Sequence, residues 1–243
     1  MAARKRLDSL LVERGLAADR EQARALIEEQ RVLVNGTYAG KAASQVLADC
    51  RLDLEQKKTY VSRGGDKLAA GLAAFAVDPA GCICADIGCS TGGFTDCLLR
   101  HGAARVYSVD VGYGVLDWTL RRDARVVVLE RTNARYLTKE EIPEPLDLGV
   151  IDASFISLHL LLEPLAALFR QGVRIIALVK PQFELPREKV ARGGVVRRRE
   201  LHRQAVAMVE EYVREAGLQC RGVTESPVRG AKGNLEFLMY ITG

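Results

Sequence analysis

One stretch of the chain decides its fold: Ala85-Asp86-Ile87-Gly88-Cys89-Ser90-Thr91-Gly92-Gly93-Phe94-Thr95. A short apolar run at residues 82–85 leads into it, and apolar residues recur at helical spacing over residues 94–99. The stretch therefore predicts a strand, a glycine-rich turn and the start of a helix. Glycine has no Cβ atom and accepts positive φ, so such a turn lets the backbone come close to a ligand.

The turn also offers hydrogen-bond donors. Ser90, Thr91 and the free N–H groups at the helix start can donate to a carboxylate. The glycines do not follow the dinucleotide pattern G-x-G-x-x-G, and no P-loop Lys-Ser/Thr pair comes after them. We interpret the turn as the S-adenosylmethionine loop of a methyltransferase, and an ordinary strand-to-helix turn is the alternative. The expected cofactor-binding residues of this loop are Asp86, Gly88, Ser90, Thr91, Gly92, Gly93 and Phe94.

Strand-like and helix-like segments alternate around the turn. The predicted strands span residues 82–87, 105–110, 125–129, 147–152 and 173–179. The predicted helices span residues 92–101, 115–121, 157–170 and 199–216. This order predicts an α/β fold with a parallel, doubly wound, Rossmann-like sheet. Two more strand-like runs, 223–225 and 235–241, predict an antiparallel hairpin at the end of the sheet, the arrangement of class I methyltransferases.

Ligands of doubly wound sheets bind at the carboxyl ends of the strands. Asp110 ends the second predicted strand, about 20 positions beyond the glycine turn, where an acidic residue can accept hydrogen bonds from ribose hydroxyls. Thr132 and Asn133 follow the third strand and form the candidate adenine edge. These three residues complete the predicted cofactor site.

Four charged residues form the candidate catalytic set: Lys67, Asp152, Lys180 and Glu236. Asp152 and Lys180 end adjacent predicted strands, where polar groups are costly unless they pair. The set resembles the Lys-Asp-Lys-Glu tetrad of FtsJ/RrmJ-type ribose 2′-O-methyltransferases, and four unrelated surface charges are the alternative. A ribose hydroxyl is a weak acid, and a lysine removes its proton only when neutral, a state that burial or a nearby cation favours. Lys180 is the expected base, and the other three residues are expected to position and tune it.

Residues 1–58 predict a separate small unit of two helices followed by a sheet. Leu7 to Val12 repeats as a helix, Asp19 suits the N-cap of a second helix, and residues 31–36 end in the hairpin signal Asn-Gly. Residues 59–63 are expected to link this unit to a methyltransferase domain at residues 64–243.

The N-terminal unit resembles an S4 RNA-binding domain. The resemblance rests on Arg6-Leu7-Asp8, Asp19-Arg20 with Ala23-Arg24, and Arg31-Val32-x-Val34-Asn35-Gly36. It implies that basic side chains grip the phosphates of folded RNA, whereas solvated surface charges are the alternative. The expected RNA-binding residues are Lys5, Arg6, Arg20, Arg24, Arg31, Lys41 and Arg63.

The motifs together resemble the TlyA/haemolysin A family over the full length of the chain. They are Ser62-Arg63-Gly64-Gly65-x-Lys67-Leu68, the glycine turn, Ile151-Asp152-Ala-Ser-Phe-Ile-Ser157, Lys180-Pro-Gln-Phe-Glu184, and Ser226-Pro227 with Gly230 and Gly233-Asn234-x-Glu236. The resemblance implies an S-adenosylmethionine-dependent enzyme that methylates the ribose of ribosomal RNA, at a cytidine of 16S and/or 23S rRNA within ribosomal subunits. The rival interpretations are a membrane-active haemolysin, an RNA-binding protein without catalysis and a small-molecule methyltransferase.

Composition narrows the possible functions further. The 243 residues carry a net charge of +4, which suits a nucleic-acid partner without requiring one. Most of the cysteines lie where disulfides would distort a strand or a helix, and their spacing matches no common zinc pattern, so no disulfide framework and no metal site are expected. No run approaches the ~18–20 apolar residues of a membrane helix. We expect a cytoplasmic monomer that does not bind membranes.

A basic, glycine-containing segment follows Pro181. Its cations are Arg187, Lys189, Arg192 and Arg197-Arg198-Arg199. We expect this segment to lie over the substrate, and an ordinary solvated face is the alternative.

Overall fold

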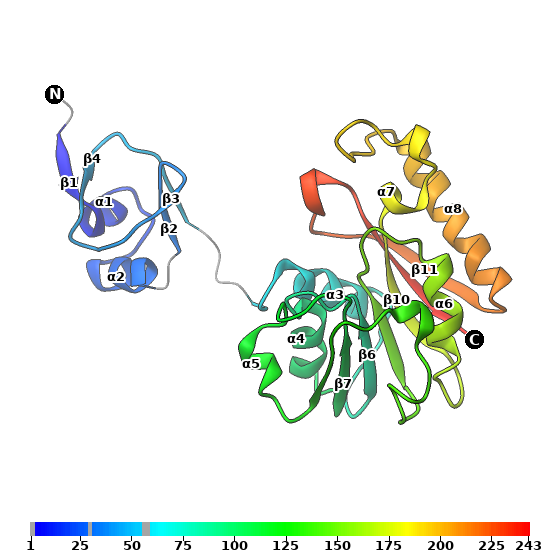
Figure 1. The fold of residues 1–243 in the computed structure, drawn as a ribbon. Coiled ribbons are helices and arrows are strands. Elements are labelled where there is room, and N and C mark those ends of the chain that lie inside the picture. The colour runs from blue at the N-terminus through cyan, green and yellow to red at the C-terminus, as the bar shows by residue number, and fades with distance from the viewer. Residues whose placement is uncertain (1–2, 29–30, 55–58) are drawn as a thin grey trace. The chain divides into compact units, whose positions relative to one another are not determined.

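A computed structural model of the chain describes residues 3–28, 31–54 and 59–243 (Figure 1). The chain divides into two units, Met1–Lys58 and Thr59–Gly243. The predicted linker at residues 59–63 packs onto the second unit, where Tyr60 is only 9% exposed and the Val61 amide donates to Asp96 Oδ2 at 2.9 Å. The second unit therefore begins before the predicted boundary at Gly64.

The described residues of the first unit form two short helices and two small sheets. The helices are α1 (Leu7–Glu13) and α2 (Arg20–Glu28). Strand β1 (Arg4–Arg6) pairs with β4 (Gln45–Leu47), and β2 (Val32–Val34) lies between β3 (Thr37–Tyr38) and β5 (Leu52–Leu54). The two helices agree with the sequence pattern, and so does the β2–β3 hairpin, whose turn residues Asn35 and Gly36 have positive φ. The pairing of β1 with β4 was not predicted.

A seven-stranded sheet forms the second unit, in the order β11-β12-β10-β9-β6-β7-β8. Its parallel strands are β6 (Ile83–Ile87), β7 (Arg105–Val109), β8 (Val126–Leu129), β9 (Leu148–Ile151) and β10 (Arg174–Val179). The hairpin of β11 (Gln219–Glu225) and β12 (Phe237–Thr242) is antiparallel and joins the sheet at β10. The structure confirms the doubly wound sheet and the C-terminal hairpin. Strand β11 begins earlier than predicted because a β-bulge between Cys220 and Gly222 lets its first residues continue the pairing with β12.

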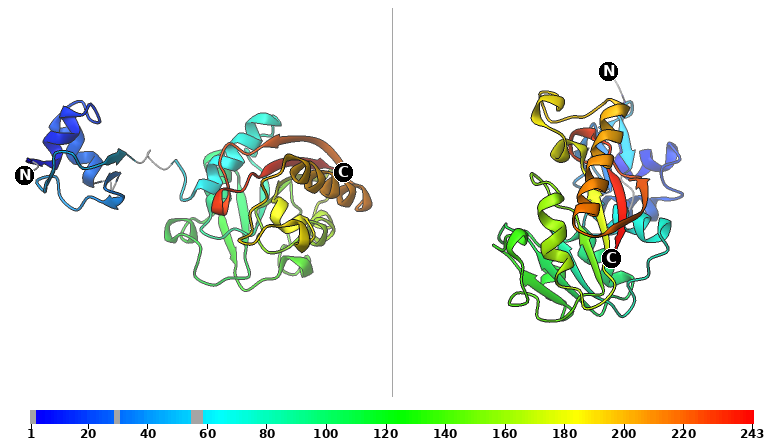
Figure 2. Two further views of the ribbon diagram at one scale, coloured as in Figure 1. Left: turned by 90° about the horizontal axis from the view of Figure 1, so that it is seen from above. Right: turned by 90° about the vertical axis from the view of Figure 1, so that its right-hand side faces the viewer.

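Helices cover both faces of this sheet (Figure 2). The helices on one face are α3 (Arg63–Ala74) and α4 (Gly93–Arg100), and those on the other are α6 (His159–Ala166) and α8 (Arg199–Glu215). Successive side chains of a strand point to opposite faces. Strand β10 therefore supplies Ile175 and Ala177 to one core and Ile176 and Leu178 to the other.

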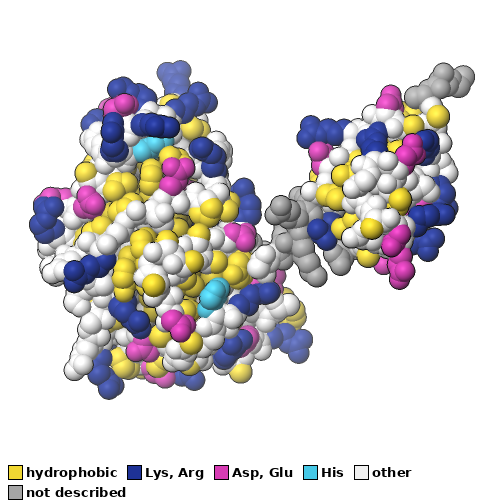
Figure 3. Space-filling view, turned by 180° about the vertical axis from the view of Figure 1, so that it is seen from behind, with side chains coloured by type: hydrophobic (Ala, Val, Ile, Leu, Met, Phe, Trp, Pro, Cys, Tyr) yellow, Lys and Arg dark blue, Asp and Glu magenta, His cyan; other side chains and the backbone are white. Residues whose placement is uncertain are grey.

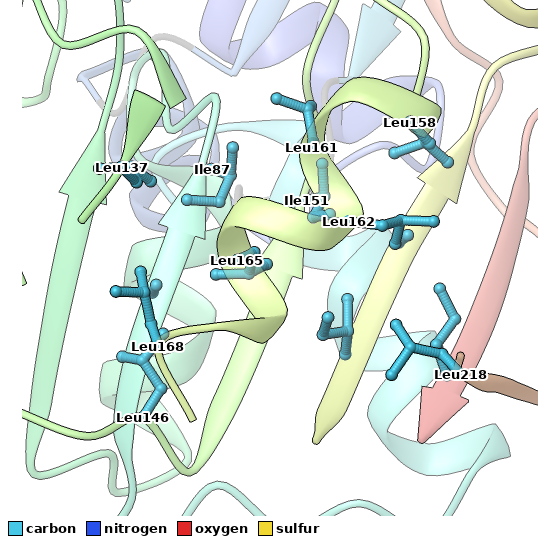
Figure 4. Close-up of a cluster of buried hydrophobic side chains, with 14 of the residues drawn as sticks. Ile87, Leu137, Leu146, Ile151, Leu158, Leu161, Leu162, Leu165, Leu168 and Leu218 are labelled. Carbon is cyan, nitrogen blue, oxygen red and sulfur yellow. The ribbon is translucent and has the colours of Figure 1, made fainter. Parts of the chain in front are cut away.

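The larger core lies under α6. Figure 4 shows Leu161, Leu162 and Leu165 of this helix over Ile87 and Ile151 of the central strands. Ile87 is the last residue of β6 and Ile151 the last of β9, so their burial fixes the two strand ends that carry the glycine turn and Asp152.

Three short elements depart from the prediction. Helix α5 (Trp118–Arg121) starts later than expected because Asp117 Oδ1 accepts a hydrogen bond from the Thr119 amide at 2.8 Å and caps the helix there. Helix α6 also starts later, because the Leu158 amide donates to Glu184 Oε1 at 3.0 Å. The short helix α7 (Pro181–Glu184), which begins with proline at its first position, was not predicted.

Within the described ranges, no helix is both long enough and apolar enough to cross a membrane.

Candidate active site

The glycine turn lies at the carboxyl end of β6. Strand β7 lies on one side of β6 and β9 on the other, so the order of the strands reverses at this point of the sheet. Gly88 and Gly92 have φ of 81° and 94°, a region that favours glycine. A Cβ atom on Gly88 would lie 2.9 Å from the Ala153 Cα, and one on Gly93 would lie 2.2 Å from Ser62 Oγ. Side chains at these positions would therefore push the turn away from β9 and α3.

A cavity of about 260 Å³ opens beside the turn. It is also lined by the start of α3, including Arg63 and Lys67, by Asp152 after β9 and by Gly230 before β12. Gly92 is the one predicted loop residue that does not line it. The predicted loop residues that do are Asp86, Gly88, Ser90, Thr91, Gly93 and Phe94.

Asp86 is fully buried in the wall of this cavity. Its Oδ2 accepts hydrogen bonds from the Thr95 amide at 2.9 Å and from Thr95 Oγ1 at 2.7 Å. Its Oδ1 has no hydrogen-bond partner in the part of the chain that the structure describes. Burial raises the pKa of Asp86 to about 7, against the opposing effect of the Thr95 hydrogen bonds. A buried acceptor without a donor is costly, so this atom calls for a donor from a ligand.

The four candidate catalytic residues form two ion pairs. Lys180 Nζ lies 2.6 Å from Asp152 Oδ1, and Lys67 Nζ lies 2.6 Å from Glu236 Oε2. The first pair is the one predicted from the parallel neighbours β9 and β10. Lys67, Lys180 and Glu236 are nearly buried, at 8%, 7% and 2% exposure. A buried charge without a partner is costly, so the lysine and the carboxylate of each pair hold one another in place.

The two pairs adjoin the same cavity, because Lys67 of one and Asp152 of the other line it. Lys180 Nζ also donates to Ser154 Oγ at 2.9 Å and to the Asp152 carbonyl at 3.2 Å. Glu236 lies just before β12, where Gly230 leaves room for its carboxylate; a Cβ atom on Gly230 would overlap Glu236 Oε1.

The other three predicted cofactor residues lie outside the cavity lining. Asp110 holds the glycine turn itself, since its Oδ2 accepts from the Ser90 amide at 2.8 Å and its Oδ1 from the Gly112 amide at 2.7 Å. Thr132 Oγ1 donates to the Glu130 carbonyl at 3.1 Å. Asn133 caps the short helix η1 (Ala134–Tyr136). The structure thus gives each of these polar groups a local partner at the end of its strand.

Two aromatic side chains beside Lys180 were missed in the sequence. Phe155 is 90% exposed, has φ of 63° and lies with its ring centroid 5.0 Å from that of Phe183. Lys180 Nζ lies 6.0 Å from the Phe183 ring centroid. Positive φ is strained for a bulky residue, and such strain is typical of functional sites. The sequence signal that could have identified them is a phenylalanine in the segment after β9 and another in the segment after β10.

Glu184 holds the segment that carries Phe155. Its buried carboxylate accepts from Ser157 Oγ at 2.6 Å and from the Leu158 amide at 3.0 Å. Burial raises the pKa of Glu184, and these hydrogen bonds oppose the rise. Because Glu184 belongs to α7 and Lys180 precedes it, the segments after β9 and β10 are joined twice, at Lys180–Asp152 and at Glu184–Ser157.

In the first unit, Asp8 gathers three of the predicted RNA-binding residues. Arg6 Nη2, Arg20 Nη2 and Arg24 Nε lie 2.7, 3.2 and 3.8 Å from Asp8 Oδ2. The Asp8 side chain is fully buried, whereas the three arginine side chains are 39–56% exposed. The Arg6 hydrogen bond and then that of Arg20 hold the pKa of Asp8 well below its usual range. The result is a surface cluster of three guanidinium groups on one carboxylate.

The remaining predicted RNA-binding residues do not join this cluster. Lys5 Nζ pairs with Glu13 at 2.6 Å. Lys41 is exposed, and Arg31 is partly buried at the start of the β2 region. Arg63 lies in the second unit, where it lines the cavity beside the glycine turn.

We expect Asp8→Asn to weaken RNA binding although it makes the cluster more positive. If Asp8 only neutralised the arginines, its removal would strengthen phosphate binding; if it orients them, affinity falls, by roughly three- to tenfold, and the salt dependence becomes shallower. Titration of a labelled rRNA fragment at several salt concentrations measures both. Asp53→Asn, which breaks the exposed Arg51–Asp53 pair instead, is the matched control. Tighter binding by Asp8→Asn would contradict the orienting role.

The sheet order, the C-terminal antiparallel hairpin and the glycine turn after β6 define a class I S-adenosylmethionine-dependent methyltransferase. The FtsJ-like methyltransferase family model matches residues 60–242, and the S4 domain model matches residues 5–49. The chain belongs to the FtsJ-like methyltransferase family and carries an S4 domain at its N-terminal end.

Relatives match almost the whole chain. The chain is 46% identical over 243 residues to the 16S/23S rRNA (cytidine-2′-O)-methyltransferase TlyA of Mycobacterium tuberculosis, covering 99% of this chain and 91% of the relative. It is 37% identical to Hemolysin A of Brachyspira hyodysenteriae, covering 97% and 98% of the two chains. A solved hemolysin-like protein from Streptococcus thermophilus has 39% identity and a TM-score of 0.77, covering 100% of this chain and 89% of that chain.

The residues beside the turn fit S-adenosylmethionine. Its ammonium and ribose hydroxyl groups are donors that suit the unpartnered Asp86 Oδ1. Its carboxylate suits Arg63 and the N–H groups around Gly93, where a Cβ atom would leave no room. The turn, Asp86 and Arg63 are therefore the groups that would hold it.

Proposed function

We propose that this protein methylates the ribose 2′-hydroxyl of ribosomal RNA, at a cytidine of 16S or 23S rRNA, or of both. The observation that carries the proposal is the placement of two Lys–carboxylate pairs, with both lysines and Glu236 buried, at the cavity beside the glycine turn. The names of the relatives support the RNA substrate and the 2′-oxygen as its acceptor. The S4 domain gives this chain a unit suited to RNA.

The chain's own residues would prepare the hydroxyl. S-adenosylmethionine, when bound, supplies the electrophilic methyl group. Lys180 would first lose its own ammonium proton to water, and its neutral Nζ would then take the hydroxyl proton and pass it to water. Asp152 orients Lys180, and Lys67 with Glu236 fixes the other side of the hydroxyl. Holding the oxygen in line with the methyl group is the main contribution of such a site.

Exposed Phe155 and partly buried Phe183 would together hold the target base. Bases in RNA are read after they leave the stack, and aromatic side chains then stack on them. The two rings lie in the segments after β9 and β10 that begin with Asp152 and Lys180, so a base stacked there would bring its ribose to the two lysines.

Methyl transfer to purified ribosomal subunits tests the proposal. Labelled S-adenosylmethionine is incubated with 30S and 50S particles, and the 2′-O-methylated positions are then mapped. We expect transfer to a small number of cytidine riboses. Label on bases, on protein or on no subunit would refute the proposal.

The relative named Hemolysin A favours one second candidate, a membrane-active protein. A liposome-leakage assay run beside the transfer assay separates the two. Leakage without methyl transfer would replace the proposed function.

Phe155→Ala is expected to raise the KM for ribosomal subunits by about 5- to 150-fold, because stacking of a base on an aromatic ring contributes about 1–3 kcal/mol. Binding of S-adenosylmethionine is expected to stay unchanged, since Phe155 does not line the cavity beside the turn. Steady-state kinetics with each substrate varied in turn measures both effects. Tyr136→Ala, which removes another exposed ring, is the control. Equal KM values in the two variants would contradict a stacking role.

A further inference from the structure

A second, larger cavity of about 750 Å³ lies between α8 and the β11–β12 hairpin. We call it the α8 groove. Its rim carries four exposed arginines, Arg197, Arg199, Arg203 and Arg229. Val223, Leu235 and Phe237 contribute to its apolar lining. In Figure 1 the start of α8 and the segment before β12 lie at the same end of the second unit, and Figure 3 shows Lys and Arg side chains gathered at that end.

The rim arginines are arranged for an anion. Arg199 and Arg203 are one helical turn apart on α8, so two cations repel each other on one face. Among the described residues, Arg197, Arg199 and Arg203 form no ion pair, although Glu210 and Glu225 also line the groove. Four cations and two carboxylates leave the lining with an excess of positive charge. A planar guanidinium matches a phosphate with two parallel hydrogen bonds, so a phosphate ligand suits this rim.

Hydrogen bonds hold the segments of the rim together. The Val196 amide donates to Asn234 Oδ1 at 2.9 Å, and Asn234 Nδ2 donates to the Gly194 carbonyl at 2.8 Å. His202 Nε2 bonds the Val196 carbonyl at 2.9 Å, which ties the same segment to α8. The loop that carries Arg197, the segment that carries Arg229 and α8 are thus joined around the groove. Asn234 and His202 are 2% and 7% exposed, so these ties are protected from water.

Two consecutive residues of the chain connect the lining of the groove with the lining of the active-site cavity. Gly230 lines the cavity beside the glycine turn, and Arg229 lines the α8 groove. A strand whose target ribose lies at the two lysine–carboxylate pairs beside this cavity would therefore place a neighbouring phosphate near Arg229. The apolar lining around Phe237 can receive the sugar and base of that flanking nucleotide.

We propose that the α8 groove binds the phosphate backbone of the RNA strand that flanks the target nucleotide, as a second RNA-binding surface besides the S4 domain. This inference rests on the proposed function for the identity of the strand. It extends the basic segment predicted in the sequence to a defined surface that includes Arg203 and Arg229. A single-stranded flank fits best, because its backbone can bend from the cavity into the groove.

Charge reversal on α8 tests the proposal. The variants are Arg199→Glu, Arg203→Glu and the double variant. The control with the same charge change is Arg170→Glu, an exposed residue in the loop before β10, at the amino ends of the parallel strands. Binding of the full-length protein to protein-free 16S and 23S rRNA fragments is measured against salt concentration. Each reversal is expected to weaken binding roughly tenfold at low salt and to reduce the salt slope by about 0.7, as for a lost phosphate contact. Arg203→Lys is expected to retain most of the affinity.

Three measurements decide the result. Thermal unfolding must show that the variants stay folded, which their exposed positions favour; a variant that unfolds is replaced by Arg→Ala at the same position, with the same expected direction. Equal affinity and slope for the double variant and Arg170→Glu would overturn the proposal. Weaker binding to intact subunits with unchanged binding to protein-free rRNA would also overturn it, because the partner would then be a ribosomal protein.

Failure of the proposed function gives a different pattern. If the wild-type protein binds rRNA through the groove but transfers no methyl group to it, the groove remains and the methylation proposal fails. If the double variant methylates subunits at wild-type kcat/KM, the groove proposal fails and methylation remains.

Discussion

Lys180→Ala is expected to lower the rate of methyl transfer by about 10²- to 10⁴-fold, the usual contribution of a positioned general base. Lys180 Nζ has three polar contacts in the site, with the Asp152 carboxylate, the Asp152 carbonyl and Ser154 Oγ. Single-turnover transfer to ribosomal subunits with saturating cofactor measures the chemical step. Affinity for rRNA is expected to stay within a few-fold of wild type, because Lys180 is assigned to a single hydroxyl group, whereas the S4 domain, the α8 groove and the Phe155–Phe183 rings are assigned the other RNA contacts.

Lys180→Arg is the sharper variant. Arginine keeps the positive charge and can still pair with Asp152, but its guanidinium does not give up a proton in proteins. A base is therefore lost while the ion pair is kept, and the rate should fall nearly as far as with alanine. An arginine variant within a few-fold of wild type would show that Lys180 acts through its charge alone and that the base lies elsewhere.

Much of the site follows from the strand pattern alone. Parallel strands bring their carboxyl ends to one edge, so Asp152 and Lys180 could be paired from the order of the strands. The glycine turn could also be placed from the sequence, because glycines in a strand-to-helix turn indicate where the backbone lies too close to other groups for a side chain.

What the pattern missed depends on contacts between distant segments. The assignment of Asp110 to the ribose stays a prediction, and strand order did not reveal that its carboxylate also accepts from the Ser90 and Gly112 amides. Phe155 was overlooked because its exposure depends on the conformation of the segment after β9, which Glu184 fixes from α7. The arginine cluster on Asp8 likewise needs α1 packed against α2 before its charges meet.

Asp86→Asn is expected to weaken binding of S-adenosylmethionine by about 10- to 150-fold, the value of a lost hydrogen bond to a charged group. The asparagine oxygen can still accept from Thr95, so the turn keeps its shape. The amide nitrogen then replaces the unpartnered Oδ1, and a donor meets the donor of the ligand. Calorimetric titration with S-adenosylmethionine measures the loss, and Asp96→Asn, a neighbouring buried acid outside the cavity lining, is the control.

The same substitution should change how the free protein responds to pH. Asp86 has a pKa of about 7 in the folded chain, above the ordinary value of 3.8, so between these values the folded state binds a proton that the unfolded state does not. This group therefore makes the wild-type protein less stable as pH rises from about 4 to about 7. Asparagine carries no such proton, so the stability of Asp86→Asn relative to wild type should increase over that range. Thermal unfolding at about pH 5 and about pH 8 measures the difference. Normal cofactor binding by Asp86→Asn would show that Asp86 does not belong to the cofactor site. A stability relative to wild type that falls with rising pH would contradict the effect of burial on the Asp86 carboxyl.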